Sequence, residues 1–500
     1  MLKTTLFLLL TCLSLTAQQK PNIIYILADD LGYGEIGVNG QRSIETPNID
    51  ALAANGMNFT QHYAGAPVCA PSRCVLLTGK HLGNAYIRGN DEWAERGEVW
   101  NLKAMNENPA LEGQRPMPDS ILTVAEILQE NGYKTALVGK WGLGAPLTES
   151  TANKQGFDYF FGYNCQRQAH TLFPTHLWEN EERYSLNNKF VDLHQKLPEG
   201  LDPYDPASYS DYQLTDYAPE IMHQKALDFL NSTDDEPFFL YYASPLPHVP
   251  LQAPDRWVLY YQEKFGLEEP YSGNYYPNRT PRATYAAMVS YLDEQVGDLV
   301  SALNAKGQLE NTLIIFSSDN GPSYAGGAQP EFFNSAGRFQ EKYGRGKGFV
   351  FEGGIRVPMI ASWPGQIRAG STSEHISSFY DFLPTVCELL KTSTPETDGI
   401  SFLPELLGEE QKVHEYLYWE FPEYKGQQAI RMGDWKAIRQ NIQEGNLEIE
   451  LYNLKKDPEE LYNLAKEEPE LVRQMEELFR QNHHQSDLTK FRMKALGDDL

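Results

Sequence analysis

The sequence predicts an α/β fold in which a mostly parallel central sheet is flanked by helices. Short apolar runs alternate along the chain with helical patterns, and this order is typical of a parallel sheet covered on both faces. After about residue 407 the pattern changes, which indicates a second, smaller unit. The predicted strands span 21–30, 133–140, 236–244 and 311–322, and the predicted helices span 123–132 and 284–307.

Each of these elements has a local justification in the sequence. The run PNIIYILADD is β-rich and ends in two aspartates, TVAEILQENG has helical spacing and a glycine stop, and YKTALVGK is again a strand with a polar end. The strand EPFFLYYAS, the long helical stretch TYAAMVSYLDEQVGDLVSALNAKG and the strand NTLIIFSSDNGP then repeat the same kinds of element. In such folds, ligands bind outside the carboxyl ends of the strands.

The C-terminal part of the chain predicts a smaller α+β domain that contains an antiparallel sheet. The segments YLYWEF, QQAIRMGDWKAIRQ and LEIELYNL have the pattern of short strands joined by turns, and EPELVRQMEELFRQNH is an amphipathic helix. We therefore predict a main domain over residues 18–407 and a C-terminal subdomain over residues 408–500.

The first 17 residues, MLKTTLFLLLTCLSLTA, have the features of a cleaved export signal. A lysine precedes an apolar run that is too short for a spanning helix, and small residues lie before Gln18. Lipid modification of Cys12 is the alternative, although Thr11 is a poor neighbour for that processing. The sequence contains no other candidate for a membrane span, so we expect a periplasmic or secreted protein without stable membrane insertion.

The composition limits the possible partners and the role of the cysteines. A net charge of -26 and an isoelectric point near 4.8 argue against general binding of nucleic acid or anionic membranes. Removal of the signal leaves Cys69, Cys74, Cys165 and Cys387, which are too sparse for a disulfide scaffold. The helix-like pattern after Pro71 also makes pairing of Cys69 with Cys74 awkward.

Polar side chains close three of the predicted strands. Asp29 and Asp30 follow the first strand, Lys140 ends the next, and Asp319 and Asn320 follow the last. Because the carboxyl ends of parallel strands meet at one edge, we expect these residues to converge. An oxygen-only ligand set favours calcium or magnesium over zinc. Taken alone, Asp29 and Asp30 are also compatible with a loop or a helix cap, and the segment DNGP that contains Asp319 and Asn320 is compatible with a turn.

One motif connects these residues with a known family. The segment PVCAPSRCVLLTG at 67–79 resembles the signature of the type I, formylglycine-dependent sulfatases of the alkaline-phosphatase-like superfamily, including bacterial glycan sulfatases. The resemblance runs almost from end to end of the chain. It continues in IIYILADDLGYGEIG, GYKTALVGKWGLG, PLPHVPLQAP, SSDNGP, KGFVFEGGIRVP, GDWKAI and LYNLKKDPEELYNLA.

The resemblance implies that a formylglycine-generating enzyme converts Cys69 to 3-oxoalanine, and it leaves Cys74 as an ordinary core residue. A hydrated formylglycine has two hydroxyls, so one can attack sulfur while the second later expels sulfate by re-forming the aldehyde. A calcium ion beside this diol would lower its pKa and neutralise a sulfate oxygen. The implied calcium ligands are Asp29, Asp30, Asp319, Asn320 and the modified Cys69.

Further catalytic roles follow from the same resemblance. Arg73 would support the diol, while Lys140 and Lys347 would hold the sulfate oxygens. His248 matches the family histidine that protonates the leaving oxygen, which a sugar alkoxide requires because it is a poor leaving group. Without the motif, the two lysines would be ordinary surface residues and His248 a loop residue.

The segment GKWGLG departs from the family pattern. Gly142 stands where the family commonly has a histidine that is thought to act on the diol proton. The sequence therefore does not identify the group that assists sulfate expulsion. His81, His170 and His176 are the candidates to replace it in space.

Two other functions remain compatible with the motifs. A phosphomonoester or phosphonate ester hydrolase would share the superfamily sheet, although such enzymes commonly use more metal-binding histidines or a second metal. A glycan-binding relative without turnover is the third possibility. Loss of catalytic activity is disfavoured because the matching catalytic residues are all intact: Cys69, Arg73, Lys140, His248 and Lys347. The glycine at position 142 leaves this third possibility open.

Two predicted loops indicate the substrate. AYIRGNDEW and NCQRQAHTLFPTHLW place forked donors, amides and imidazoles beside aromatic residues, as proteins do when they bind sugars. We expect exo-removal of sulfate from a terminal galactose or N-acetylgalactosamine of a sulfated glycan, with His170 contacting a hydroxyl adjacent to the sulfate. The alternative is that these side chains only brace their loops. The predicted substrate-binding residues are Arg88, Asn90, Asp91, Gln166, Arg167, His170 and His176.

Overall fold

A computed structural model describes residues 20–212, 214–234, 236–340 and 342–499. Its centre is a ten-stranded sheet in the order β11-β2-β10-β9-β1-β8-β4-β5-β6-β7. The described residues also form a two-stranded sheet, β12-β3, and a four-stranded sheet, β13-β14-β15-β16. The proposed export signal and Cys12 lie outside the described residues.

The strands of the main sheet are short in its outer parts and longest in the middle, where the chain is most deeply buried. Their bounds, with those of the smaller sheets, are β1 Asn22–Ala28, β2 Met57–Phe59, β3 His62–Tyr63, β4 Lys134–Lys140, β5 Tyr159–Tyr163, β6 His176–Glu179, β7 Glu182–Ser185, β8 Phe238–Ala243, β9 Thr312–Ser318, β10 Met359–Ser362, β11 Ser371–Ser373, β12 Ser377–Ser378, β13 Leu417–Phe421, β14 Gln427–Met432, β15 Trp435–Gln440 and β16 Glu450–Asn453.

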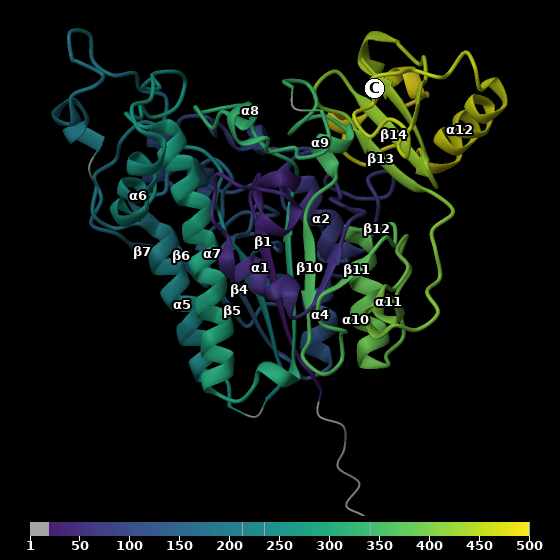
Figure 1. The fold of residues 1–500 in the computed structure, drawn as a ribbon, viewed down its shortest axis with the longest axis horizontal. Helices are drawn as coiled ribbons and strands as arrows, with labels where there is room; N and C mark the ends of the chain where they lie inside the picture. Colours follow the sequence, from purple (N-terminus) through teal and green to yellow (C-terminus); the bar gives the residue numbers. More distant parts are fainter. Residues whose placement is uncertain (1–19, 213, 235, 341, 500) are drawn as a thin grey trace, which may run out of the picture.

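Helices lie on both sides of the main sheet, with α5, α6 and α7 on one side in Figure 1 and α2, α4, α10 and α11 on the other. The α-helices are α1 Pro47–Ala54, α2 Cys69–Thr78, α3 Leu102–Glu107, α4 Val124–Glu130, α5 Ala218–Ser232, α6 Asp255–Phe265, α7 Pro281–Ala305, α8 Pro330–Phe333, α9 Glu352–Ile355, α10 Phe382–Leu390, α11 Leu403–Leu407 and α12 Pro469–Asn482.

The predicted fold class is confirmed. The strands β9, β1, β8, β4 and β5 run parallel to one another, and antiparallel strands extend the sheet on both sides. Side chains of β1 alternate between two cores, as the two-residue period of a strand requires. Tyr25 and Leu27 pack with α2 and α10, while Ile24 and Ile26 pack with α5 and α7. The sequence pattern did not predict the short outer strands.

The C-terminal region forms its own antiparallel sheet of β13 to β16, covered by α12. In Figure 1 it sits at the same end of the molecule as α8 and α9. A buried cluster of charges joins it to the main domain. Lys436 of β15 lies 2.9 Å from Glu352 of α9 and 2.9 Å from Glu460. The exact boundary at residue 407 stays a prediction.

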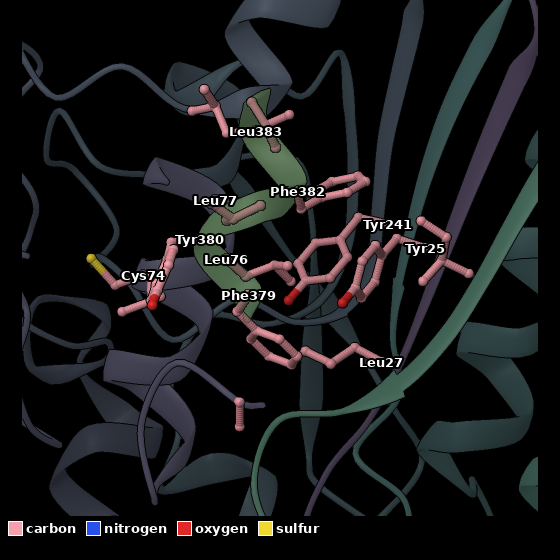
Figure 2. Packing of buried hydrophobic residues seen from close by; sticks show 14 of the residues in the cluster. Tyr25, Leu27, Cys74, Leu76, Leu77, Tyr241, Phe379, Tyr380, Phe382 and Leu383 are labelled. Atoms are coloured by element: carbon pink, nitrogen blue, oxygen red, sulfur yellow. The ribbon is translucent and has the colours of Figure 1, made fainter. Parts of the chain in front are cut away.

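Helix α2 is fixed by a core that Figure 2 shows from close by. Leu76 and Leu77 of α2 lie among Tyr25, Phe379 and Phe382, and all five are buried. Cys74 is buried in the same cluster, as predicted for a core residue. The packing fixes the helix whose first residue is Cys69. Within the described residues, none of the helices combines the length and the apolar character needed to cross a bilayer.

We predict that Leu76→Ala lowers the free energy of unfolding by about 2–5 kcal/mol, because it removes a fully buried side chain and leaves a cavity beneath α2. Leu267→Ala is the matched control, since Leu267 is 88% exposed and its loss should change stability by less than about 0.5 kcal/mol. Chemical denaturation of both variants measures the difference. Equal effects would show that α2 is not held by this core.

Candidate active site

The carboxyl ends of β1, β4 and β9 bring the predicted polar residues together. Because Ala28 of β1 and Ser318 of β9 are in register, the residues that follow them lie side by side. The backbone N–H of Asp30 donates to Oδ1 of Asp319 at 3.1 Å, and the amide of Asn320 donates to Oδ1 of Asp30 at 2.9 Å. All three side chains are buried.

Helix α2 brings Cys69 to the same edge of the sheet. The thiol of Cys69 donates to Oδ1 of Asp29 at 3.3 Å, and it is 2% exposed. Burial, and then the charge of Asp29, raises the pKa of this thiol well above its ordinary value. One potential ligand atom from each of Asp29, Asp30, Cys69 and His248 lies within 4.8 Å of the others. The unmodified thiol is therefore held as a neutral group inside a cluster of carboxylates.

Arg73 occupies the next turn of α2 and is fully buried. Its Nε and Nη2 donate to Oδ2 of Asp319 at 3.1 and 2.9 Å, and its Nη1 donates to the carbonyl of Lys140 at 2.7 Å. The guanidinium thus ties α2 to the ends of β9 and β4. Burial and the charge of Asp29 nevertheless raise the pKa of the Asp319 carboxyl to about 6.

Two lysines complete the charge balance of the cluster. Lys140, the last residue of β4, donates to Asp29, and Lys347 lies 2.7 Å from Asp30. Burial alone would raise the pKa of the Asp29 carboxyl, but Lys140, His248 and Arg73 lower this pKa well below its usual range. Burial would lower the pKa of the Lys347 ammonium, but Asp30 raises it well above its usual range. These cations can meet an anionic substrate.

His248 lies in the loop after β8, and its ring orientation is fixed. Its Nδ1 donates to the carbonyl of Val249, so its Nε2 is directed to the site, 3.6 Å from Oδ2 of Asp30. Burial, and then the charge of Lys347, lowers the pKa of His248 well below its ordinary value. The ring of His170 stacks on His248 with centroids 4.9 Å apart.

The donor set fits a hard cation. Asp29, Asp30 and Asp319 supply carboxylate oxygens, and Oδ1 of Asn320 is buried without a hydrogen-bond partner. A buried carbonyl oxygen normally has a donor, so a cation at this point would satisfy it. Oxygen ligands of this kind suit calcium or magnesium.

Of the three histidines considered as replacements at position 142, one reaches the site. His81 packs against Tyr418, with ring centroids 5.1 Å apart, and His176 lies 3.0 Å from Glu112. Only His170, among these three, stacks on His248.

A different side chain covers Gly142. A Cβ built at Gly142 would lie 2.4 Å from Nε2 of Gln166, so the amide occupies the space that a larger residue would need. Gly142 also has a φ of +72°, and Nε2 of Gln166 is buried without a hydrogen-bond partner. Sequence reasoning selected Gln166 as a sugar ligand but could not connect it with Gly142.

The other predicted substrate residues differ in their contacts. The side chain of Asn90 accepts a hydrogen bond from the backbone N–H of Ala70 at 3.1 Å, directly beside Cys69. Arg88 is buried and donates to Glu420 at 2.8 Å and to three backbone carbonyls. These contacts join its loop to the C-terminal sheet.

Three further loop residues also make bracing contacts. Arg167 pairs with Glu92, His176 lies against Glu112, and Asp91 pairs with Arg115. The contacts of Arg88, Arg167, His176 and Asp91 correspond to the bracing role that the sequence left open. His170 and Asn90 are the members of the predicted set that lie beside His248 and Cys69, and Gln166 lies over Gly142.

Sequence reasoning missed two residues near the site. The Tyr275 ring lies 5.8 Å from that of His170, and Glu423 accepts a hydrogen bond from the backbone of Asn90 at 3.2 Å. Burial raises the pKa of Glu423 to about 7. Neither has a local signal, because each reaches the site from a distant part of the chain.

Comparison with known proteins decides the family. A family model described as Sulfatase matches residues 21–392, well over half of the chain. The chain belongs to the sulfatase family. A second model, described as N-sulphoglucosamine sulphohydrolase, C-terminal, matches residues 343–485 of this sulfatase.

Curated relatives agree with this assignment. N-acetylgalactosamine-6-sulfatase of Canis lupus familiaris is 32% identical over 436 residues, which cover 84% of this chain and 72% of the relative. Arylsulfatase A of Homo sapiens is 33% identical over 443 residues, which cover 86% of this chain and 77% of the relative. The sulfatase is therefore a sulfuric ester hydrolase.

Solved structures share the fold. Ps i-CgsB in complex with k-i-k-neocarrahexaose has a TM-score of 0.73 and 29% identity, with 94% of each chain covered. The phosphonate monoester hydrolase of Agrobacterium radiobacter has a TM-score of 0.64 and 22% identity, with 93% of this chain and 96% of that chain covered. The second likeness concerns the fold alone.

We predict that Gly142→Ala destabilises the sulfatase by about 1–3 kcal/mol, because a side chain at positive φ would also collide with Gln166. Gly408→Ala is the matched control, since Gly408 has a φ of +71° and nothing within 4 Å of its built Cβ. Thermal and chemical unfolding measure the loss of stability in each variant. When Gln166→Ala is added to Gly142→Ala, the part of the loss that exceeds that of Gly408→Ala should disappear, because the collision is removed. No recovery would argue against the contact.

Proposed function

We propose that this sulfatase removes an O-sulfate from a terminal galactose or N-acetylgalactosamine of a sulfated glycan. The observation that carries the proposal is the position of Cys69. It lies at the first residue of α2, against Asp29, which also contacts Lys140, and its sulfur lies within 4.8 Å of a ring nitrogen of His248. A sulfate ester in this position would meet a nucleophile on one side and a proton donor on the other.

Two groups would complete the chemistry. A formylglycine made from Cys69 would supply a diol nucleophile that can later release sulfate, and calcium would supply a positive charge that favours the ionised diol and a bound sulfate oxygen. Asp29, Asp30, Asp319 and Asn320 would hold the ion together with residue 69. The orphaned Oδ1 of Asn320 supports this ligand set.

The cations of the chain itself have separate tasks. Lys140 and Lys347 would hold the sulfate oxygens, because both are fixed beside the carboxylates at the sheet edge. Arg73 would orient residue 69 through its hold on Asp319 and on the carbonyl of Lys140. Fixed charges of this kind need no reorganisation as the transition state forms.

His248 would protonate the leaving sugar oxygen. Its Nδ1 proton is donated to the carbonyl of Val249, so Nε2 is the nitrogen that would first take up a proton and then pass it to the leaving oxygen, and the negative charge of a bound sulfate would favour the protonated ring. A sugar alkoxide leaves poorly without such a proton. His170, stacked on His248, would contact a hydroxyl adjacent to the sulfate, and the amides of Gln166 and Asn90 would bind neighbouring oxygens.

The sugar assignment has independent support from relatives. Several curated relatives are N-acetylgalactosamine-6-sulfatases, and the neighbour Ps i-CgsB was solved with k-i-k-neocarrahexaose. The proposed partners are therefore a sulfated carbohydrate and a formylglycine-generating enzyme. The proposed location is the periplasm or the exterior, as the N-terminal pattern of residues 1–17 suggests.

We predict that enzyme from a host with the modifying machinery releases sulfate, and not phosphate, from a panel of galactose and N-acetylgalactosamine monoesters. Ion chromatography of both anions on one purified sample measures this. His170→Ala should change the preference among the sugars, because the imidazole would contact a hydroxyl. Turnover of aryl sulfates alone, or faster release of phosphate, would refute the proposed function.

A mass spectrum of the peptide that contains Cys69 is the control for this experiment. Active preparations should show the mass of the aldehyde in place of the thiol, and Cys69→Ala should be inactive. An intact thiol in a fully active sample would rule out formylglycine.

We predict that chelation abolishes activity and that calcium restores it better than zinc, because the proposed ligands are oxygens. Calcium should also raise the melting temperature of the chelated protein, since a ligand that binds only the folded state stabilises it. Asn320→Ala should reduce this rise, whereas Asn304→Ala, on the distant end of α7, should keep it. Full activity after thorough demetallation would contradict the calcium site.

A further inference from the structure

Four aromatic side chains form a row beside Lys347, called here the aromatic row: Tyr324, Tyr343, Phe349 and Tyr424. Successive ring centroids along the row are 6.0, 6.2 and 5.6 Å apart. The first three belong to the main part of the chain, and Tyr424 lies in the turn between β13 and β14. The row therefore crosses from one sheet to the other.

The row adjoins the catalytic centre through the two glycines that flank Lys347. A Cβ built at Gly346 would lie 2.7 Å from Cε2 of Tyr324, and one built at Gly348 would lie 2.9 Å from Cε1 of Tyr424. The two rings thus rest directly on the backbone that carries Lys347. The ammonium of this lysine is 2.7 Å from Asp30, so the row begins where a sulfate would bind.

Two members of the row are open to solvent. The exposed fractions are 71% for Tyr343 and 51% for Tyr424. Aromatic rings that are contiguous with one another and with an active site, yet remain exposed, mark a surface that a ligand covers. Tyrosine suits this task because a rigid apolar ring carries a polar end.

A cavity of about 520 Å³ adjoins the aromatic row. Tyr324 and Tyr343 line it together with Tyr271, Asn274, Tyr275 and Glu331. The Tyr275 ring lies 5.8 Å from the ring of His170, which stacks on His248. The cavity is thus connected to His248 through the rings of Tyr275 and His170.

The chemistry of this surface matches a carbohydrate chain. A pyranose presents an apolar C–H face, which stacks on an aromatic ring, and a rim of hydroxyls, which bond to amides and carboxylates. The volume lies within the range of roughly 300–1,000 Å³ typical of ligand pockets. The lining is aromatic and amide-bearing with a carboxylate at Glu331, so it suits neutral sugar units better than further sulfated ones.

We infer that the aromatic row and this cavity bind the neutral sugar units that follow the sulfated terminal sugar. The substrate is then an oligosaccharide or polysaccharide rather than a free sulfated monosaccharide. This inference rests on the proposed function and adds to it a second binding region and a requirement for chain length.

Kinetics on two substrates test the inference. The probes are the sulfated monosaccharide that the enzyme turns over fastest and a tetrasaccharide with the same unit at its non-reducing end, followed by neutral sugars. The native enzyme should have a higher kcat/KM for the tetrasaccharide. Tyr343→Ala should lower that value about five- to tenfold and leave the monosaccharide value within about twofold, whereas Tyr424→Ala, whose ring lies against Gly348, should lower the tetrasaccharide value by a larger factor than the monosaccharide value.

Tyr204→Ala is the matched control, because Tyr204 is 50% exposed on a different loop and its loss should change neither value. Equal kcat/KM for the two substrates in the native enzyme, or equal losses on both in the variants, would overturn the inference.

A binding measurement separates this inference from the proposed function. If no sugar sulfate is turned over, the proposed function fails, and a tetrasaccharide with a sulfated N-acetylgalactosamine followed by neutral sugars is titrated by calorimetry into Cys69→Ala, which cannot form the aldehyde. If the double variant Cys69→Ala, Tyr343→Ala binds the tetrasaccharide more weakly than Cys69→Ala does, the aromatic row is supported as a sugar-binding surface. An unchanged Kd, or no binding at all, overturns it.

Discussion

The balance of buried charge at the carboxyl edge of the main sheet is the interaction on which the rest of the site depends. Asp29, Asp30 and Asp319 are almost fully excluded from water, and isolated carboxylates in such a position would be very unfavourable. Arg73, Lys140 and Lys347 compensate them through direct contacts. The same cations that stabilise the folded edge are the ones proposed to hold the oxygens of an anionic ester.

The C-terminal sheet is part of this arrangement and not an independent appendage. Lys436 reaches Glu352 of α9, only five residues beyond Lys347, and Arg88 reaches Glu420 of β13. Breaking one partner of a buried pair would leave the other uncompensated, so the two sheets are held in a defined relation. This relation brings Glu423 to the loop of Asn90 and Tyr424 to the backbone of Lys347.

The pair formed by Gly142 and Gln166 shows how a departure from a family motif is accommodated. Glycine at positive φ opens a space two residues beyond Lys140, and the amide of Gln166 occupies it. An amide can donate a hydrogen bond but cannot act as a base at neutral pH, so it does not duplicate an imidazole. Among the three histidines weighed as replacements at position 142, His170 is the one that reaches the reacting groups.

The sequence by itself determined the four neighbouring strands β9, β1, β8 and β4 of the main sheet and the polar residues that follow β1 and β9 and end β4. Those residues converge because parallel strands share a carboxyl edge, whatever the loops do. Tertiary structure alone decided which loop side chains face the site. Arg88 turns to Glu420, 332 residues away, while His170 turns to His248. A loop side chain takes its direction from such distant contacts, and no local pattern encodes them.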